Sequence, residues 1–333
     1  MAAATQTAPY GTCRNSAMMK AAAPITGGIN CPPVEPTDSI AADRCGVKPD
    51  LTIVGIVTMP TASTFETALP EIMPQFAANL GYLFTERPLL ERIDAAAAAG
   101  FKAVELQFPY DVPAAAVKAA IGKNNLTILG INTPPGEREG EFGLAAVPGR
   151  EKDWQALFAR AFDYASAIGG SAIHCLAGKV APEQRPSADR VFIDNLARAA
   201  DLAAAKNITL LIEPINAHDR PNYFLNHVEH AADVIAKIGK PNIRMQFDFY
   251  HVQVVGGDLT RRLGKFLPVI GHLQCAAVPS RHEPDEGEVN YPAVFEAVDR
   301  LGYRGWIGAE YRPRGRTEDG LGWARAYGVV PSR

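Results

Sequence analysis

The chain has 333 residues, of which 47% are hydrophobic and 21% are charged, and its formal net charge is -3. This composition is typical of a globular protein with a large core and excludes an intrinsically disordered chain. No apolar run reaches the roughly 18 to 20 residues of a membrane-spanning helix, and the slightly acidic charge offers no broad basic surface for nucleic acid. We therefore expect a soluble protein that binds a small molecule, with no nucleic-acid or membrane partner; the composition leaves a homo-oligomer open.

The five cysteines indicate the cellular compartment. Cys13, Cys31 and Cys45 lie in the N-terminal stretch, and Cys175 and Cys275 lie far apart in apolar segments. No C-x-x-C spacing indicates a zinc site or a redox pair. An odd number of scattered cysteines is unlike the disulfide framework of a secreted protein, so we expect a reducing, cytoplasmic location.

Residues 1–72 differ in composition and periodicity from the rest of the chain. They are rich in Ala, Thr, Pro and Ser and show neither a helical nor a strand period. We expect a largely disordered extension, in which only the run LTIVGIVTM at 51–59 has the pattern of a strand. Met73 can be the true start of the protein, and a tag or targeting peptide is the other explanation. The folded domain is then expected to span residues 73–333.

From Gln75 onward, short apolar runs alternate with helical patterns, which is the signature of repeated βα units and a parallel sheet. The pattern predicts eight strands, at residues 76–79, 103–107, 126–132, 171–175, 208–213, 243–248, 270–275 and 306–310. Eight strands and their helices in about 260 residues match a (β/α)8 TIM barrel. Because the first strand lacks the G-x-G-x-x-G turn of a doubly wound sheet, we prefer the barrel and expect no nucleotide cofactor.

Local signals predict the helices between these strands. The first helix is expected to have Thr85 as its N-cap and to end at Gly100. A stripe of apolar residues predicts a longer helix over about residues 152–168. Asn290 is expected to cap the helix before the last strand.

The ends of the last four predicted strands are polar, and they carry Glu213, Asp248, Gln274 and Glu310. A TIM barrel builds its active site at the C-terminal ends of its strands, so these side chains should meet. Three carboxylates and an amide oxygen form a hard oxygen set, which suits Mg²⁺ or Mn²⁺ better than zinc. The sequence therefore predicts a divalent-metal site. Pairing of each acid with an Arg or Lys, or capping of the next helix, is the alternative.

Four further residues are candidates for binding the substrate. His251 follows Asp248 by three residues and can reach the substrate or hydrogen-bond a metal ligand. Asp219 and Arg281 lie in loops on the same face, where Arg281 can bind a substrate carboxylate; surface salt bridges are the alternative for both. His174 ends the fourth predicted strand, where it can face the pocket or sit in the core.

Three more polar residues have less specific signals. His272 precedes Gln274 by two residues, so its side chain is expected on the same side of the strand, toward the barrel interior. Glu105 lies in the middle of a predicted strand, where it can form a buried pair or support the site. Glu283 is expected to be a solvated loop charge.

The sequence resembles the hydroxypyruvate isomerase family, within the xylose isomerase-like TIM barrels. The resemblance covers residues 74 to 325 and runs through FAANLGYLFTERPLLERI, VELQFPYD, LIEPIN, NYFLN, QFDFYH, GDLTR, RHEPDEGEVNYP and GAEYRPRG. It implies that Glu213, Asp248, Gln274 and Glu310 hold a divalent metal and that Glu213 and Glu310 also act as proton donor and acceptor. Related sugar epimerases have a His where Gln274 stands, so weaker metal binding is expected here.

The resemblance also implies a reaction, the interconversion of hydroxypyruvate and 2-hydroxy-3-oxopropanoate (tartronate semialdehyde). In such a reaction a metal polarises the carbonyl and hydroxyl oxygens and stabilises an enediolate. One glutamate removes the carbon-bound proton and the other delivers a proton to the neighbouring carbon. Their pKa values must then be separated by their environments.

Three other functions stay open from the sequence. A 2-oxo-tetronate isomerase acts on a four-carbon acid, and the same residues can serve it. A metal-dependent phosphodiesterase or DNA-repair nuclease needs a His-rich multi-zinc cluster and a basic groove, whereas the chain has seven histidines and a net negative charge. A barrel that binds a ligand without catalysis is the third, and the intact ring of four polar strand ends argues against it.

Overall fold

The computed structural model describes residues 74–331. The predicted extension over residues 1–72, the strand predicted at 51–59 and Met73 lie outside the described residues. Within residues 74–331, no helix is both long and apolar enough to cross a lipid bilayer.

The described residues form a closed barrel of parallel strands, in which each strand pairs with its sequence neighbours and the first pairs with the last. The strands are β1 (Gln75–Asn79), β2 (Ala103–Leu106), β3 (Thr127–Asn132), β4 (Ala172–His174), β5 (Thr209–Ile212), β6 (Ile243–Asp248), β7 (Ile270–Cys275) and β8 (Trp306–Ala309). The predicted TIM barrel is therefore confirmed, and each strand boundary lies within one residue of its predicted position.

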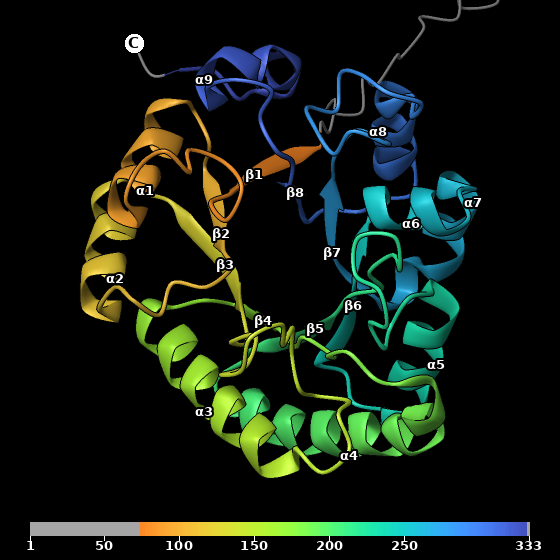
Figure 1. The fold of residues 1–333 in the computed structure, drawn as a ribbon. Helices are drawn as coiled ribbons and strands as arrows, with labels where there is room; N and C mark the ends of the chain where they lie inside the picture. Colours follow the sequence, from red (N-terminus) through yellow and green to blue (C-terminus); the bar gives the residue numbers. More distant parts are fainter. Residues whose placement is uncertain (1–73, 332–333) are drawn as a thin grey trace, which may run out of the picture. The chain divides into compact units, whose positions relative to one another are not determined.

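Helices form an outer layer around the ring of strands (Figure 1). They are α1 (Leu89–Ala98), α2 (Ala114–Lys123), α3 (Glu151–Ile168), α4 (Arg185–Ala204), α5 (Val228–Ile238), α6 (Phe249–Val255), α7 (Leu259–Phe266), α8 (Tyr291–Arg300) and α9 (Thr317–Gly320), with short 3-10 turns η1 (Pro182–Gln184), η2 (Leu267–Val269) and η3 (Leu321–Tyr327). The long helix predicted at 152–168 is α3.

The predicted helix ends are correct in two of three cases. Asn290 caps α8, since its Oδ1 accepts a hydrogen bond from the N–H of Ala293 at 3.4 Å. Gly100 follows α1 with φ +101°, a conformation that favours glycine. The prediction of Thr85 as N-cap is wrong, because α1 begins only after Pro88, whose φ of -59° suits the entry to a helix without a side-chain cap.

Alternation along each strand separates the apolar core from a polar barrel interior. In β6, Met245 and Phe247 are fully buried in the hydrophobic core cluster, while Gln246 lies between them and donates to Glu213 at the end of the adjacent strand β5. The aromatic ring of Phe76 in β1 contacts the outer layer, with its centroid 4.9 Å from that of Phe295 in α8. In β6, side chains of opposite character therefore point to opposite faces of the strand.

The barrel interior contains polar side chains, although the centre of this fold is typically filled by branched apolar residues. His272 points inward as predicted, and its Nε2 lies 3.0 Å from Oε2 of Glu105. A Cβ atom at Gly308 would lie 1.8 Å from Glu105 Oε1, so the carboxyl group occupies the space above this glycine. A cavity of about 540 Å³ runs from these side chains toward the N-terminal ends of the strands, where Arg244 and Arg304 also line it.

Candidate active site

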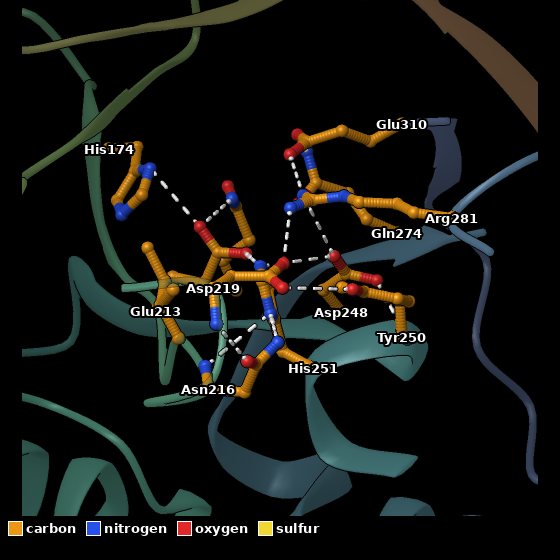
Figure 2. A network of polar contacts seen from close by, with 12 residues as sticks. His174, Glu213, Asn216, Asp219, Asp248, Tyr250, His251, Gln274, Arg281 and Glu310 are labelled. Atoms are coloured by element: carbon orange, nitrogen blue, oxygen red, sulfur yellow. Dashed lines mark hydrogen bonds and ion pairs between the residues drawn. The ribbon is translucent and has the colours of Figure 1, made fainter. Parts of the chain in front are cut away.

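The four polar strand ends converge at the C-terminal end of the barrel, as Figure 2 shows. Asp248 ends β6 and Gln274 lies in β7, while Glu213 and Glu310 each follow directly after β5 and β8. All four side chains are buried, with at most 6% of their surface exposed. Glu213 and Glu310 also line one cavity of about 90 Å³. The structure thus brings the predicted residues together and gives the two glutamates a shared space.

Glu310 is held by a dense set of donors. Its Oε2 accepts hydrogen bonds from Asn79 Nδ2 at 2.8 Å and from Gln274 Nε2 at 2.7 Å. Its Oε1 accepts one from Arg281 Nη2 at 2.8 Å. Burial raises the pKa of Glu310 to about 8, although the Arg281 guanidinium opposes this shift. Glu310 is therefore a buried carboxyl group whose pKa lies well above its ordinary value.

Glu213 has a different environment. Its Oε2 accepts a hydrogen bond from Gln246 Nε2 at 3.0 Å, and its Oε1 has no hydrogen-bond partner. Burial and the charges of Glu310 and Asp248 raise the pKa of Glu213 well above its ordinary value. A neutral amide contacts Glu213 whereas a guanidinium contacts Glu310, so the two glutamates have the unlike surroundings that acid–base pairing requires.

The two carboxylate oxygens of Asp248 differ, because one accepts a hydrogen bond and the other does not. Its Oδ1 accepts a hydrogen bond from the N–H of Tyr250 at 2.9 Å, which caps α6. Its Oδ2 is buried without a hydrogen-bond partner, 3.8 Å from Arg281 Nη2. Burial raises the pKa of Asp248 to about 6, and the positive charge of Arg281 lowers it.

Arg281 and Asp219 form a partly buried ion pair, with Nη1 and Oδ2 3.1 Å apart. A surface salt bridge is the wrong interpretation of Arg281, because only 7% of this residue is exposed and it also pairs with Glu310. Asp219 Oδ1 accepts a hydrogen bond from the hydroxyl of Tyr250 at 3.1 Å. Asp219 therefore positions Arg281 through the ion pair and does not itself line the 90 Å³ cavity.

The hydrogen bonds of Asn216 determine the tautomer of His251. Asn216 Oδ1 accepts from the N–H of Asp219 at 2.7 Å, so its Nδ2 is the atom that lies 2.7 Å from His251 Nδ1. The backbone N–H of Asn216 also points at Nδ1, at 3.4 Å. Because two donors face Nδ1, this nitrogen must accept, and the ring proton sits on Nε2. His251 Nε2 then presents an N–H toward Glu213 Oε1 and Asp248 Oδ2, each 3.7 Å away.

His174 faces the pocket rather than the hydrophobic core. It lines the 90 Å³ cavity, and its Nδ1 lies 3.5 Å from Glu213 Oε2 without forming a hydrogen bond. Burial lowers the pKa of His174 to about 3, so the ring is neutral. Both of its ring nitrogens are without a hydrogen-bond partner among the residues that the structure describes, which leaves them free for a ligand.

The donor set fits a hard divalent cation. Glu213 Oε1, Asp248 Oδ2 and Gln274 Oε1 are all buried oxygens without a hydrogen-bond partner. Ligand atoms of Glu213, Asp248 and His251 lie within 4.8 Å of one another, but the Nε2–H tautomer makes His251 a donor and not a ligand. Unpaired buried oxygens are costly, and a cation is the group that satisfies several of them together.

The sequence-based prediction missed several residues that shape the site. Gln246 and Asn216 contact Glu213 and His251, and the strand period could have indicated Gln246, which stands two residues before Asp248. The expectation for Glu283 was wrong, because it is 1% exposed. Glu283 Oε2 pairs with Arg314 Nε at 2.9 Å, a partner from the next loop of the barrel.

Comparison with known proteins agrees with this architecture. Residues 93–327 match the family described as "Xylose isomerase-like TIM barrel". The chain belongs to this family. A 2-oxo-tetronate isomerase from Cupriavidus necator is 49% identical over 77% of this chain and 99% of its own length. A hydroxypyruvate isomerase from Escherichia coli is 39% identical over 77% of this chain and 100% of its own length. The resemblance found in the sequence motifs is confirmed.

One similar solved structure has a different kind of name. A crystal structure described as AP endonuclease, family 2, from Brucella melitensis is 44% identical, with a TM-score of 0.75 over 77% of this chain and 99% of that chain. A nuclease of this fold would need a His-rich multi-zinc cluster. Within residues 74–331, the cluster of possible metal ligands that the structure brings together is Glu213, Asp248 and His251, which is mostly oxygen.

Proposed function

We propose that this protein is an isomerase that moves a carbonyl group between adjacent carbons of a short hydroxy-keto acid, with hydroxypyruvate as its three-carbon substrate. The observation that carries this proposal is the placement of two buried glutamates, Glu213 and Glu310, on one small cavity. Two carboxyl groups in unlike environments are what a proton transfer between neighbouring carbons requires.

The reaction needs two proton movements. One glutamate removes a proton from C3 of hydroxypyruvate and the other delivers a proton to C2, while the C3 hydroxyl proton is transferred to the C2 oxygen. In the reverse direction, Glu213 and Glu310 exchange these roles. Burial raises the pKa of Glu310 and the Arg281 guanidinium opposes that rise, so Arg281 makes the ionised form more accessible. His251 directs its Nε2–H at the position where a substrate oxygen would lie between the carboxylates.

A divalent metal, Mg²⁺ or Mn²⁺, would be held by Glu213, Asp248 and Gln274 through their unpaired oxygens. Both oxygens of Glu310 accept hydrogen bonds from neighbouring side chains, so Glu310 would become the fourth ligand only by giving up one of these bonds. When bound, such an ion polarises the substrate carbonyl and stabilises negative charge on the enediolate. Gln274 donates both hydrogens of Nε2, to Glu105 Oε2 at 3.1 Å and to Glu310, so its Oε1 stays available. The two hydrogen bonds of Nε2 thus fix the orientation of the Gln274 amide and leave Oε1 available to a cation.

A four-carbon substrate is the second candidate. The observation that favours it is the 49% identity to the 2-oxo-tetronate isomerase, compared with 39% to the hydroxypyruvate isomerase. The two acids share a 2-oxo group beside a hydroxyl-bearing C3, so Glu213 and Glu310 can serve both. They differ by one CHOH group, which affects the length of the pocket and not its acid–base residues.

Incubation of the purified protein with each acid tests the proposal. ¹H NMR should show isomerisation of hydroxypyruvate, of 2-oxo-tetronate, or of both, and kcat/KM ranks the two. Treatment with a chelator should abolish turnover, and Mg²⁺ or Mn²⁺ should restore it. Failure to convert either acid in the presence of these metals would overturn the function, and full activity after chelation would overturn the metal.

A further inference from the structure

Arg220 lies at the wall of the 90 Å³ cavity that Glu213 and Glu310 share, although nothing in the sequence pattern pointed to it. Its backbone is fixed, because its N–H donates to the carbonyl of Asn216 at 3.1 Å and its own carbonyl accepts from the N–H of Tyr223 at 3.1 Å. Its side chain is exposed. The loop after β5 therefore presents a guanidinium at the solvent side of the cavity.

An aromatic ring positions this guanidinium. The Cζ atom of Arg220 lies 4.3 Å from the centroid of the Phe142 ring, and Phe142 lines the same cavity. Stacking on a ring engages the face of the planar group and leaves its N–H edge free to bind an acceptor. The arrangement restricts the side chain without using its hydrogen-bond donors.

The two arginines that line this cavity differ in how their charge is matched. Arg281 pairs with Glu310 at 2.8 Å and Asp219 at 3.1 Å, so its positive charge is already neutralised. In the described part of the chain, no carboxylate lies within ion-pairing distance of Arg220. A hydroxy-keto acid that enters the cavity brings a carboxylate close to two glutamates, and like charges repel unless a cation compensates them. Arg220 is suited to this role and Arg281 is not.

We propose that Arg220 binds the carboxylate of the substrate through a bidentate contact and thereby selects short hydroxy-keto acids over neutral sugars. This inference rests on the proposed function, and it assigns to Arg220 the contact that the sequence alone had suggested for Arg281. Arg220 lines the same cavity as Glu213, Glu310 and His251, so a carboxylate bound by Arg220 leaves these three side chains to the proton transfer.

A charge series at this position tests the proposal with the acid that the wild-type protein converts. Replacing Arg220 by Lys, Gln and Glu should raise KM in that order. Loss of a charge-assisted hydrogen bond predicts a roughly 10- to 100-fold increase for R220Q, with kcat of the same order as wild type. Arg160 is a matched control, because it is also exposed and stacked, with its Cζ 4.8 Å from the Tyr110 ring, but does not line the cavity. Replacing Arg160 by Lys, Gln and Glu should leave KM unchanged.

The outcomes separate this inference from the proposed function. A wild-type protein that converts neither acid overturns the function and the inference together. A wild-type protein that converts one acid, with KM for R220Q equal to that for R160Q, overturns the role of Arg220 alone. A fall in kcat at constant KM, or a KM that does not follow the charge of the side chain, would also contradict it. Circular dichroism of each variant confirms that it is folded.

Discussion

Asn216 shows how a single amide can define the hydrogen-bonding role of a neighbouring histidine in the candidate active site. Its Oδ1, Nδ2 and backbone N–H are all engaged, and the pattern leaves Nδ1 of His251 as an acceptor. A histidine that coordinates a metal through Nε2 would need the opposite tautomer. The hydrogen bonds of one buried residue therefore decide whether its neighbour is a donor or a ligand.

This assignment is testable by NMR at the residue scale. In wild-type protein labelled with ¹⁵N-histidine, we expect His251 to be neutral with the proton on Nε2. Asn216→Asp places a carboxylate against Nδ1, which favours a proton there and should shift the Nδ1 resonance toward that of a protonated nitrogen. His251→Gln identifies the signal. An unprotonated Nε2 in the wild-type ring would disprove the tautomer.

At the scale of the strands, the position of Gln274 depends on β2 and β8. Glu105 in β2 accepts from Gln274 Nε2, and its other oxygen fills the space above Gly308 in β8. A methyl group at Gly308 would also lie 2.9 Å from Gln274 Cγ. Side chains and backbone of β2, β7 and β8 thus share one packing constraint inside the barrel, and an added methyl group in β8 would displace Glu105 and, through it, Gln274.

We predict that Gly308→Ala lowers both stability and activity. Overpacking at a site of this kind costs about 1–3 kcal/mol, and the displacement of Gln274 should reduce kcat/KM by roughly tenfold or more. The control is Gly122→Ala in α2, where nothing lies within 4 Å of the added atom and stability should rise by about 0.5–1 kcal/mol. Urea unfolding and steady-state kinetics measure both effects. Normal stability of Gly308→Ala would show that Glu105 can move freely.

The sequence was most informative about features of the fold that follow from a local pattern of residues. The strands were recognisable from apolar runs, and their C-terminal ends identified Glu213 and Glu310 because the barrel places every such end on one face. Pairings between loops were not recognisable in this way. Glu283 was expected in solvent but pairs with Arg314, 31 residues later, and only the closed barrel brings these two loops together.

At the scale of the whole molecule, the buried carboxyl groups link stability to pH. The folded protein raises the pKa of Asp248 from 3.8 to about 6 and that of Glu310 from 4.5 to about 8. A raised pKa means that the folded state binds the proton more tightly, so the stabilisation from these protons is present at low pH. It is lost as pH rises through about 6 and then about 8.

Chelated protein should therefore melt at a lower temperature at pH 8.5 than at pH 5.5, by roughly 3 °C or more. Mg²⁺ or Mn²⁺ binds the ionised carboxylates, so the increase in Tm on adding metal should be larger at the higher pH. Differential scanning calorimetry at the two pH values, with and without EDTA, measures this difference. An equal metal effect at both values would mean that these carboxyl groups are not linked to the metal.

Substitution of Glu213 and of Glu310 by Gln tests whether these two side chains transfer the proton. Rates of isomerisation are measured with the substrate that the wild-type protein converts, and Glu283→Gln serves as a buried carboxyl control outside the cavity. The account predicts that Glu213→Gln and Glu310→Gln each lower kcat by at least about 100-fold while remaining folded, and that the control keeps activity of the same order as wild type. Near-normal turnover by either folded glutamate variant would contradict it.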